Sequence, residues 1–267
     1  PAWMPGYYQL MDYAKNVEHF SVKSLEGKVM KWQQSSQNVW IVDCGAVKNF
    51  SVSYDVKADR KFVANSYLDS ERAYISPAGI FLYTEENMQQ PVTVVIKPFA
   101  AWKNIATGLE PVHGKKNTYT ANNFDILYDC PVLAGNLEEL PSFSINKIPH
   151  RFVGYKLGDF EKNLFMDELK KVVQAGIDII GDIPYTHYTF IAIGPGRGGI
   201  EHLNNTTVSF EGSSLNTTGG KERMMSFLAH EYFHHYNVKR IRPAELGPFD
   251  YTKPNRSNQL WISEGLT

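Results

Sequence analysis

The sequence is poor in cysteine, in long apolar runs and in excess charge. Its 267 residues include only two cysteines, Cys44 and Cys130, which excludes a framework of several disulfides. We favour two unpaired core thiols, with a single disulfide as the alternative. No run of eighteen apolar residues occurs, so no membrane-spanning helix is predicted. The net charge of −1 and a basic cluster limited to residues 239–242 argue against a nucleic-acid partner.

The beginning of the chain also lacks familiar features. The first residue is Pro1 rather than methionine, and residues 1–6 have neither the charged start nor the apolar stretch of a signal peptide. No internal repeat or low-complexity tract is visible. We therefore expect a piece of a longer protein, cut at both ends. Its localisation stays open between the bacterial cytoplasm and periplasm, and its oligomeric state is equally open.

The first 150 residues have the pattern of a β domain. Hydrophobic residues make up 43% of the chain and aromatic residues 13%, which is ample for packed cores. Short runs rich in β-branched and aromatic residues alternate with polar turns. These runs, each expected to be a strand, are residues 38–42, 50–56, 80–83 and 91–97. The pattern predicts an antiparallel β-sandwich over residues 1–150, ending in a crossing connection at 141–149.

The pattern changes to mixed helix and strand after Gly158. A broad apolar face from Phe160 to Val173 predicts a helix, which Gly176 and Gly181 are expected to interrupt near its end. Beyond it we expect a strand, a turn and a second extended stretch, at residues 187–193, 194–197 and 199–210. The fold class is thus α+β, with a second domain over residues 151–267.

The segment His230-Glu231-Tyr232-Phe233-His234 carries the chemistry of the chain. Residues 221–229 before it are rich in helix formers, so the segment is expected on a helix. At 3.6 residues per turn, His230 and His234 lie on one face, and Glu231 is within about 100° of both. Glu264, thirty positions after His234, supplies a carboxylate. Two imidazoles and a carboxylate form the open ligand set of a catalytic Zn²⁺ site, with Glu231 as general base.

Three neighbours of this segment receive weaker assignments. His235 projects about 100° away from the ligand face, so we expect it on the surface or behind a ligand rather than on the metal. Asn237 and Asp250 could orient ligands through hydrogen bonds, or could serve a turn or a helix cap. For Lys239, Arg240 and Arg242 we expect solvated or salt-bridged positions at a helix end.

A longer string around the motif resembles a known family. Residues 230–243, then Phe249-Asp250-Tyr251 and residues 260–267, closely resemble the glycyl aminopeptidases, zinc peptidases of the gluzincin clan that usually carry a C-terminal PDZ domain. The likeness extends to Trp3-Met4-Pro5-Gly6-Tyr7-Tyr8 and to residues 123–131. It implies an N-terminal β-sandwich and a truncated thermolysin-like catalytic domain. The rest of that domain, with an oxyanion-stabilising tyrosine, and a PDZ domain would lie beyond Thr267.

The same resemblance suggests how a substrate is held. Gly198-Gly199-Ile200-Glu201-His202 is similar to the Gly-x-Met-Glu-Asn strand of related aminopeptidases, whose glutamate binds the free α-amine of the peptide. Carried over, Glu201 anchors the amino terminus, and Gly198 and Gly199 leave room for the substrate backbone. His202 departs from the pattern, because the relatives have asparagine there. A solvated charge at a strand edge is the alternative for Glu201.

These observations predict a zinc aminopeptidase. Its substrate would be a peptide with a free amino terminus, and the resemblance implies a small terminal residue such as glycine. Two alternatives remain at this point. One is a zinc endopeptidase, in which Glu201 would not select a free amine. The other is a scaffold that binds partners through its sandwich and PDZ domain and whose zinc site is vestigial.

Overall fold

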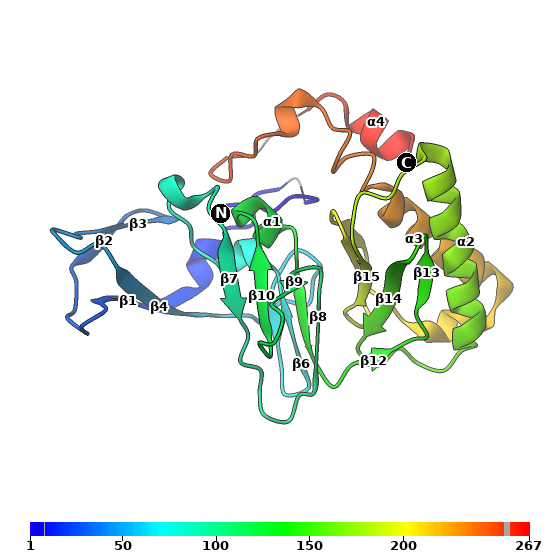
Figure 1. The fold of residues 1–267 in the computed structure, drawn as a ribbon, viewed down its shortest axis with the longest axis horizontal. Helices are drawn as coiled ribbons and strands as arrows, with labels where there is room; N and C mark the ends of the chain where they lie inside the picture. The colour runs from blue at the N-terminus through cyan, green and yellow to red at the C-terminus, as the bar shows by residue number, and fades with distance from the viewer. Residues whose placement is uncertain (8, 254–256) are drawn as a thin grey trace.

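The computed structural model describes residues 1–7, 9–253 and 257–267. Tyr8, part of the family-like segment near the start, lies outside the described residues. The described chain forms a β-rich half and a mixed half, seen side by side in Figure 1. The strands β1 to β4 project from one end of the molecule, and the long helices α2 (Lys162–Ile180) and α3 (Thr218–Phe233) lie at the other.

Four small antiparallel sheets build the first half. Their strand orders are β1-β4, β2-β3, β7-β10-β9 and β5-β6-β11-β8. Every strand pairing in them is antiparallel. The strands are β1 (Val17–Ser24), β2 (Trp32–Ser36), β3 (Val39–Val42), β4 (Phe50–Val56), β5 (Tyr67–Leu68), β6 (Arg72–Ile75), β7 (Val92–Val95), β8 (Asn104–Thr107), β9 (Glu110–Pro111), β10 (Thr118–Ala121) and β11 (Val132–Gly135). The predicted α+β class with an N-terminal antiparallel β domain is therefore confirmed.

A six-stranded mixed sheet organises the second half. Its order is β12-β14-β15-β17-β16, and β13 also pairs with β14. The central pairs β14-β15 and β15-β17 are parallel, whereas β16 runs antiparallel to β17 at the edge. These strands are β12 (Glu138–Glu139), β13 (Phe143–Ile145), β14 (Ile148–Gly154), β15 (Tyr188–Ala192), β16 (Gly199–Glu201) and β17 (Asn205–Val208). The edge position of β16 leaves one of its sides without a strand partner in the sheet.

Short helices connect these layers. Besides α2 and α3, the chain forms α1 (Phe124–Tyr128), α4 (Leu260–Gly265) and the 3₁₀ turns η1 (Tyr13–Asn16), η2 (Pro77–Gly79), η3 (Glu85–Asn87), η4 (Gly212–Asn216) and η5 (Ala244–Leu246). After α3 the chain crosses back over the β-rich half, and α4 then returns toward α3 (Figure 1). No helix among the described residues is long and apolar enough to cross a membrane.

The central sheet is buried on both faces, because side chains alternate along its strands. Phe152 and Phe190 point into one core, which they share with Leu169 of α2 and Leu228 of α3. Their neighbours in sequence point into a second core, which contains Trp3, Met4 and Tyr74 of the first half. In that core lie Val153, Ile191, Ile193 and Ile200. The β-rich half therefore covers the sheet face opposite the helices.

Several predicted elements are present, and two are wrong. The strands expected near 38–42, 50–56, 91–97 and 187–193 are confirmed as β3, β4, β7 and β15. Residues 80–83 form no strand, because the amides of Ile80 and Phe81 both donate to the carbonyl of Pro77 and close a turn. Residues 141–149 are no simple connection: β13 and the start of β14 form a hairpin whose turn is Asn146-Lys147, with φ of 49° and 68°.

Other expectations need adjustment. Gly176 does not interrupt α2 but lies within it, and a Cβ there would be 3.0 Å from the Tyr232 ring of α3. The expected stretch at 199–210 is two strands, β16 and β17, that pair with each other. Residue 150 falls inside β14, so we propose to place the domain boundary between β11 and β12. Cys44 is half-buried and Cys130 buried, and both are free thiols.

We predict that Gly154→Ala destabilises the chain, because β14 and β15 approach closely at this residue. A Cβ on Gly154 would lie 2.5 Å from both Ala192 Cβ and Leu157 Cδ2. Such overpacking costs about 1–3 kcal/mol. The matched control is Gly219→Ala in the first turn of α3, where the nearest atom is the mobile Arg223 guanidinium at 3.3 Å. Urea unfolding should show a loss for the first variant only; equal stability of the two would contradict the close packing.

Candidate metal centre and amine-binding pocket

The helix α3 presents the first part of the site. Its N-terminus is capped by the Thr217 hydroxyl, which accepts a hydrogen bond from the Gly220 amide at 3.1 Å. Gly220 must be glycine here, since a Cβ would lie 1.8 Å from the Ser214 carbonyl oxygen of η4. The last residues of the helix include His230 and Glu231, and His234 is its C-cap with helical φ and ψ of −60° and −22°. The expected helical spacing of the motif is therefore present.

His230, His234 and Glu264 converge on one point. Their ligand atoms all lie within 4.8 Å of one another. The two Nε2 atoms of the histidines are 3.0 Å apart, and Oε2 of Glu264 is 3.4 Å from one and 3.5 Å from the other. Ligands on tetrahedral zinc, with bonds of about 2.0–2.1 Å, are separated by about 3.3 Å. The donor set and its spacing thus fit a zinc ion.

Hydrogen bonds orient the side chains of these candidate ligands. Nδ1 of His234 donates to the carbonyl of Asn237 at 3.1 Å, so that Nε2 keeps its lone pair. The amide side chain of Asn237 donates to the carbonyl of Ile262 at 3.1 Å and to the hydroxyl of Thr267 at 2.9 Å. Asn237 therefore ties the end of α3 to α4, which carries Glu264. Burial, followed by the charge of His234, lowers the pKa of His230 and favours its neutral, metal-binding form.

Glu231 lies beside the three candidate ligands in a buried environment. Its side chain is 6% exposed, and a Cβ on Gly199 would lie only 2.7 Å from its carboxyl carbon. Burial raises the pKa of Glu231 to about 8, and the charges of Glu201 and Glu264 add to this effect. A dication held by the triad would offset that rise. A buried carboxyl beside a metal, with a pKa near neutrality, suits a general base.

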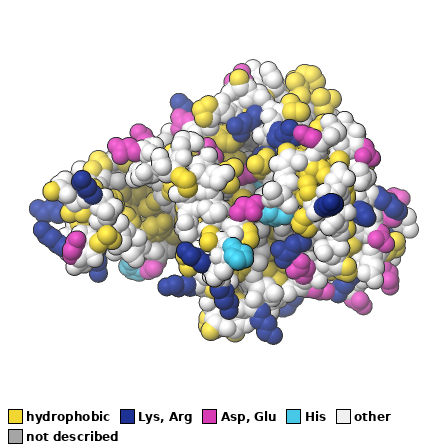
Figure 2. Space-filling view, viewed as in Figure 1, with side chains coloured by type: hydrophobic (Ala, Val, Ile, Leu, Met, Phe, Trp, Pro, Cys, Tyr) yellow, Lys and Arg dark blue, Asp and Glu magenta, His cyan; other side chains and the backbone are white. Residues whose placement is uncertain are grey.

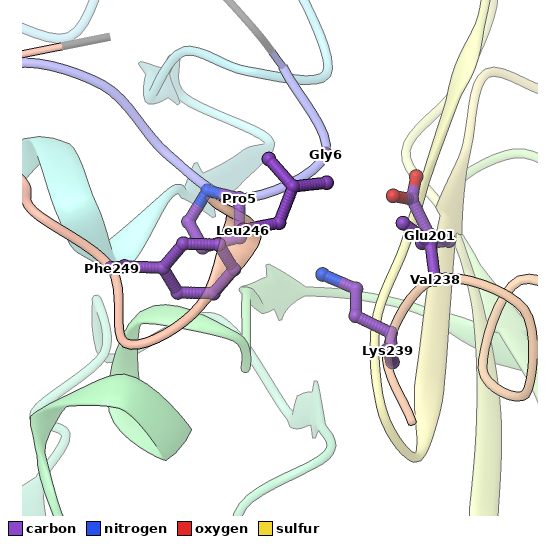
Figure 3. Close-up of a pocket in the computed structure, with 7 residues that line it drawn as sticks. All are labelled: Pro5, Gly6, Glu201, Val238, Lys239, Leu246 and Phe249. Carbon is purple, nitrogen blue, oxygen red and sulfur yellow. The ribbon is translucent and has the colours of Figure 1, made fainter. Parts of the chain in front are cut away.

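Glu201 provides a third carboxylate close by. It ends β16 and is 7% exposed; its backbone pairs with Thr206 of β17, but its carboxylate forms no hydrogen bond or ion pair with the described residues. Gly6, with φ of +88°, packs against it: a Cβ there would lie 3.1 Å from Oε2 of Glu201 and 2.6 Å from Ile200. Figure 3 shows Glu201 and Lys239 on one side of a small pocket, with Pro5, Leu246 and Phe249 on the other. A buried carboxylate of this kind can bind a cationic group.

The edge strand β16 is positioned to hold an extended peptide. It pairs with β17 through residues 199–201, and its other edge has no strand partner in the described sheet. Gly198 has φ of +86°, and the space around its missing Cβ is open except for Val63 at 3.9 Å. Gly199 lies directly over Glu231. A peptide backbone added at this edge would run past both Glu231 and Glu201.

The predictions for the residues next to the motif have different outcomes. The expectation of a surface position for His235 is wrong: the ring is fully buried, and its Nδ1 donates to the Tyr232 carbonyl of α3. His235 is not among the candidate ligands. Asp250 stabilises a turn through Thr252, whose amide and hydroxyl donate to it at 2.9 and 2.6 Å. Lys239 is not solvated but forms a buried ion pair with Asp129. Sequence reasoning missed the ion pair of Asp129 with Lys239 and the contact of Gly6 with Glu201, although both Asp129 and Gly6 lie in family-like segments.

The chain is similar to several known proteins. Residues 1–136 match the Peptidase M61 N-terminal domain, and residues 223–267 match the M61 glycyl aminopeptidase model. An aminopeptidase N family protein from Idiomarina loihiensis is 27% identical with a TM-score of 0.93; the alignment covers all of this chain and 47% of that protein. The chain thus spans about half the length of this relative. No curated protein matches the chain.

Two further structures align less closely. An M1 zinc metallopeptidase from Deinococcus radiodurans is 15% identical with a TM-score of 0.48, over 83% of this chain and 54% of that one. Legionella pneumophila aminopeptidase A is 13% identical with a TM-score of 0.49, over 83% and 29%. The N-terminal family match covers half of the chain by itself, and the second match contains the histidines and Glu264. The chain belongs to the M61 glycyl aminopeptidase family of peptidases.

Proposed function

We propose that the protein is a zinc aminopeptidase that removes amino-terminal residues, small ones such as glycine, from peptides. The observation that carries this proposal is Glu201, a buried carboxylate without a partner among the described residues and next to the metal-binding triad. An ammonium group is the natural partner for such a carboxylate. A peptide bond in the middle of a chain offers no such cation, so the pocket favours exopeptidase action.

The side chains have distinct roles in this reaction. His230, His234 and Glu264 would hold Zn²⁺, which would act as a Lewis acid when bound. Glu231 takes a proton from the attacking water and passes it to the nitrogen of the leaving amine. Glu201 binds the α-ammonium group and sets which peptide bond reaches Glu231. The edge of β16 that has no strand partner in the described sheet, beginning at Gly199, aligns the substrate backbone by main-chain hydrogen bonds, and Gly198 before it leaves room for that backbone.

The small pocket beside Glu201 supports the preference for small terminal residues. Its free volume is about 10 Å³, roughly the space for one water molecule. Pro5, Leu246 and Phe249 form its apolar wall. A terminal residue with a large side chain would have to displace this wall further than glycine would. Competing interpretations are an endopeptidase and an inactive scaffold, and the variants below separate them.

We expect Glu231→Gln to keep the metal and lose turnover. The variant retains all three ligands but has no base, and general-base catalysis is worth about 10²–10⁴-fold in rate. In contrast, His230→Ala should lose the zinc itself. Metal content and cleavage of an unblocked glycyl peptide by the full-length protein measure both effects. A Glu231→Gln variant with near-normal turnover would refute the assignment, and a zinc-free wild-type protein would favour the scaffold.

We expect Glu201→Gln to weaken binding of unblocked peptides. The variant loses a charge-assisted hydrogen bond worth about 1.5–3 kcal/mol, equivalent to a KM roughly 10- to 100-fold higher. The matched control is Glu222→Gln, on the exposed surface of α3. KM is measured for the same peptide with a free and with an acetylated amino terminus. Equal cleavage of both peptides by the wild-type protein would identify an endopeptidase.

A further inference from the structure

A buried ion pair lies beside the pocket of Glu201. Nζ of Lys239 is 2.8 Å from Oδ1 of Asp129, and the two side chains are 7% and 11% exposed. The same carboxylate accepts a hydrogen bond from the Leu203 amide at 2.6 Å and lies 3.2 Å from Nδ1 of His202. Asp129 belongs to the β-rich half, whereas these three partners belong to the catalytic half. One carboxylate therefore joins the two halves at a point next to Glu201.

Lys239 also borders the pocket that Glu201 enters. Both side chains lie on the same side of the pocket in Figure 3, and Lys239 is the one cation among the described residues that line it. Yet its ammonium group pairs with Asp129 and makes no ion pair with Glu201 in the described structure. A cation and an unpaired carboxylate thus share a small pocket without neutralising each other.

The charge on Asp129 accounts for this separation. Burial by itself would raise the pKa of Asp129, but the charge of Lys239 and the hydrogen bond from His202 outweigh it and lower that pKa to about 2. Asp129 is therefore ionised over the whole physiological range. Without that charge, the buried ammonium of Lys239 would need another anion, because an unpaired buried charge is very unfavourable. Glu201 is the carboxylate of the same pocket.

We propose that Asp129 is a positioning residue that holds Lys239 away from Glu201 and so keeps the amine anchor open for substrate. This inference rests on the proposed function, because it assigns to Glu201 the α-ammonium group of the peptide. An ammonium group from the protein itself would compete with that of the substrate for one carboxylate. Such an internal competitor raises KM, but it leaves kcat unchanged because saturating substrate displaces it.

The test uses the full-length, zinc-loaded protein and an unblocked glycyl peptide. Asp129→Asn should raise KM at least tenfold while zinc content stays at the wild-type level and kcat changes less than threefold. Adding Lys239→Met in the same chain removes the competitor and should bring KM back to within threefold of the Lys239→Met single variant. The matched control is Asp182→Asn, which breaks the exposed Asp182–Arg240 ion pair of 2.8 Å on the same segment and should leave KM unchanged.

A purely structural role for Asp129 gives the opposite pattern. The double variant would then have a KM as high as that of Asp129→Asn or higher, and this result would overturn the proposal. If Asp129→Asn alone does not fold, the double variant is compared with the Lys239→Met single variant. The proposal requires that their KM values agree within threefold, and a larger difference would overturn it. Failure of the proposed function looks different: wild-type protein would cleave blocked and unblocked peptides equally well.

Discussion

Burial of Glu231 beside two other carboxylates is the central constraint of this structure. Burial, followed by the charges of Glu201 and Glu264, raises the pKa of Glu231. A cation that entered this region would favour the ionised form of Glu231, because an opposite charge offsets both effects. His230, His234 and Glu264 next to Glu231 form a candidate group for such a cation, a metal ion.

The fold keeps these charges in place through a sheet buried on both faces. The helices α2 and α3 cover one face, and the β-rich half covers the other. The strand β16 lies at the edge of this sheet, beside the zinc-binding helix. At the far end of the molecule, hydrophobic side chains line a hollow between the projecting strands and the body (Figure 2). The candidate site lies where a strand of the sheet meets a helix. Elements of regular secondary structure hold side chains in a more precise geometry than loops do.

The amino-acid sequence predicts features that depend on local spacing. The ligand face of α3 follows from helical periodicity, and β15 follows from its continuous apolar run. Residues 80–83 mislead because an apolar run does not reveal whether its backbone pairs in a sheet. Here the carbonyls of Ile80 and Phe81 accept hydrogen bonds from the Tyr54 and Tyr128 hydroxyls instead. The Asp129–Lys239 pair joins residues 110 positions apart, and no local pattern in a single sequence reports such a contact.

The contact between Gly6 and Glu201 has a consequence for how such proteins can evolve. Gly6 belongs to the segment that opens the chain, yet it packs against the residue at the heart of the catalytic half. The β-rich half therefore contributes Pro5 and Gly6 to the wall of the pocket that Glu201 enters. Exchange of this half between relatives by recombination would change the residues of that wall, so sequence changes in the two halves have to match.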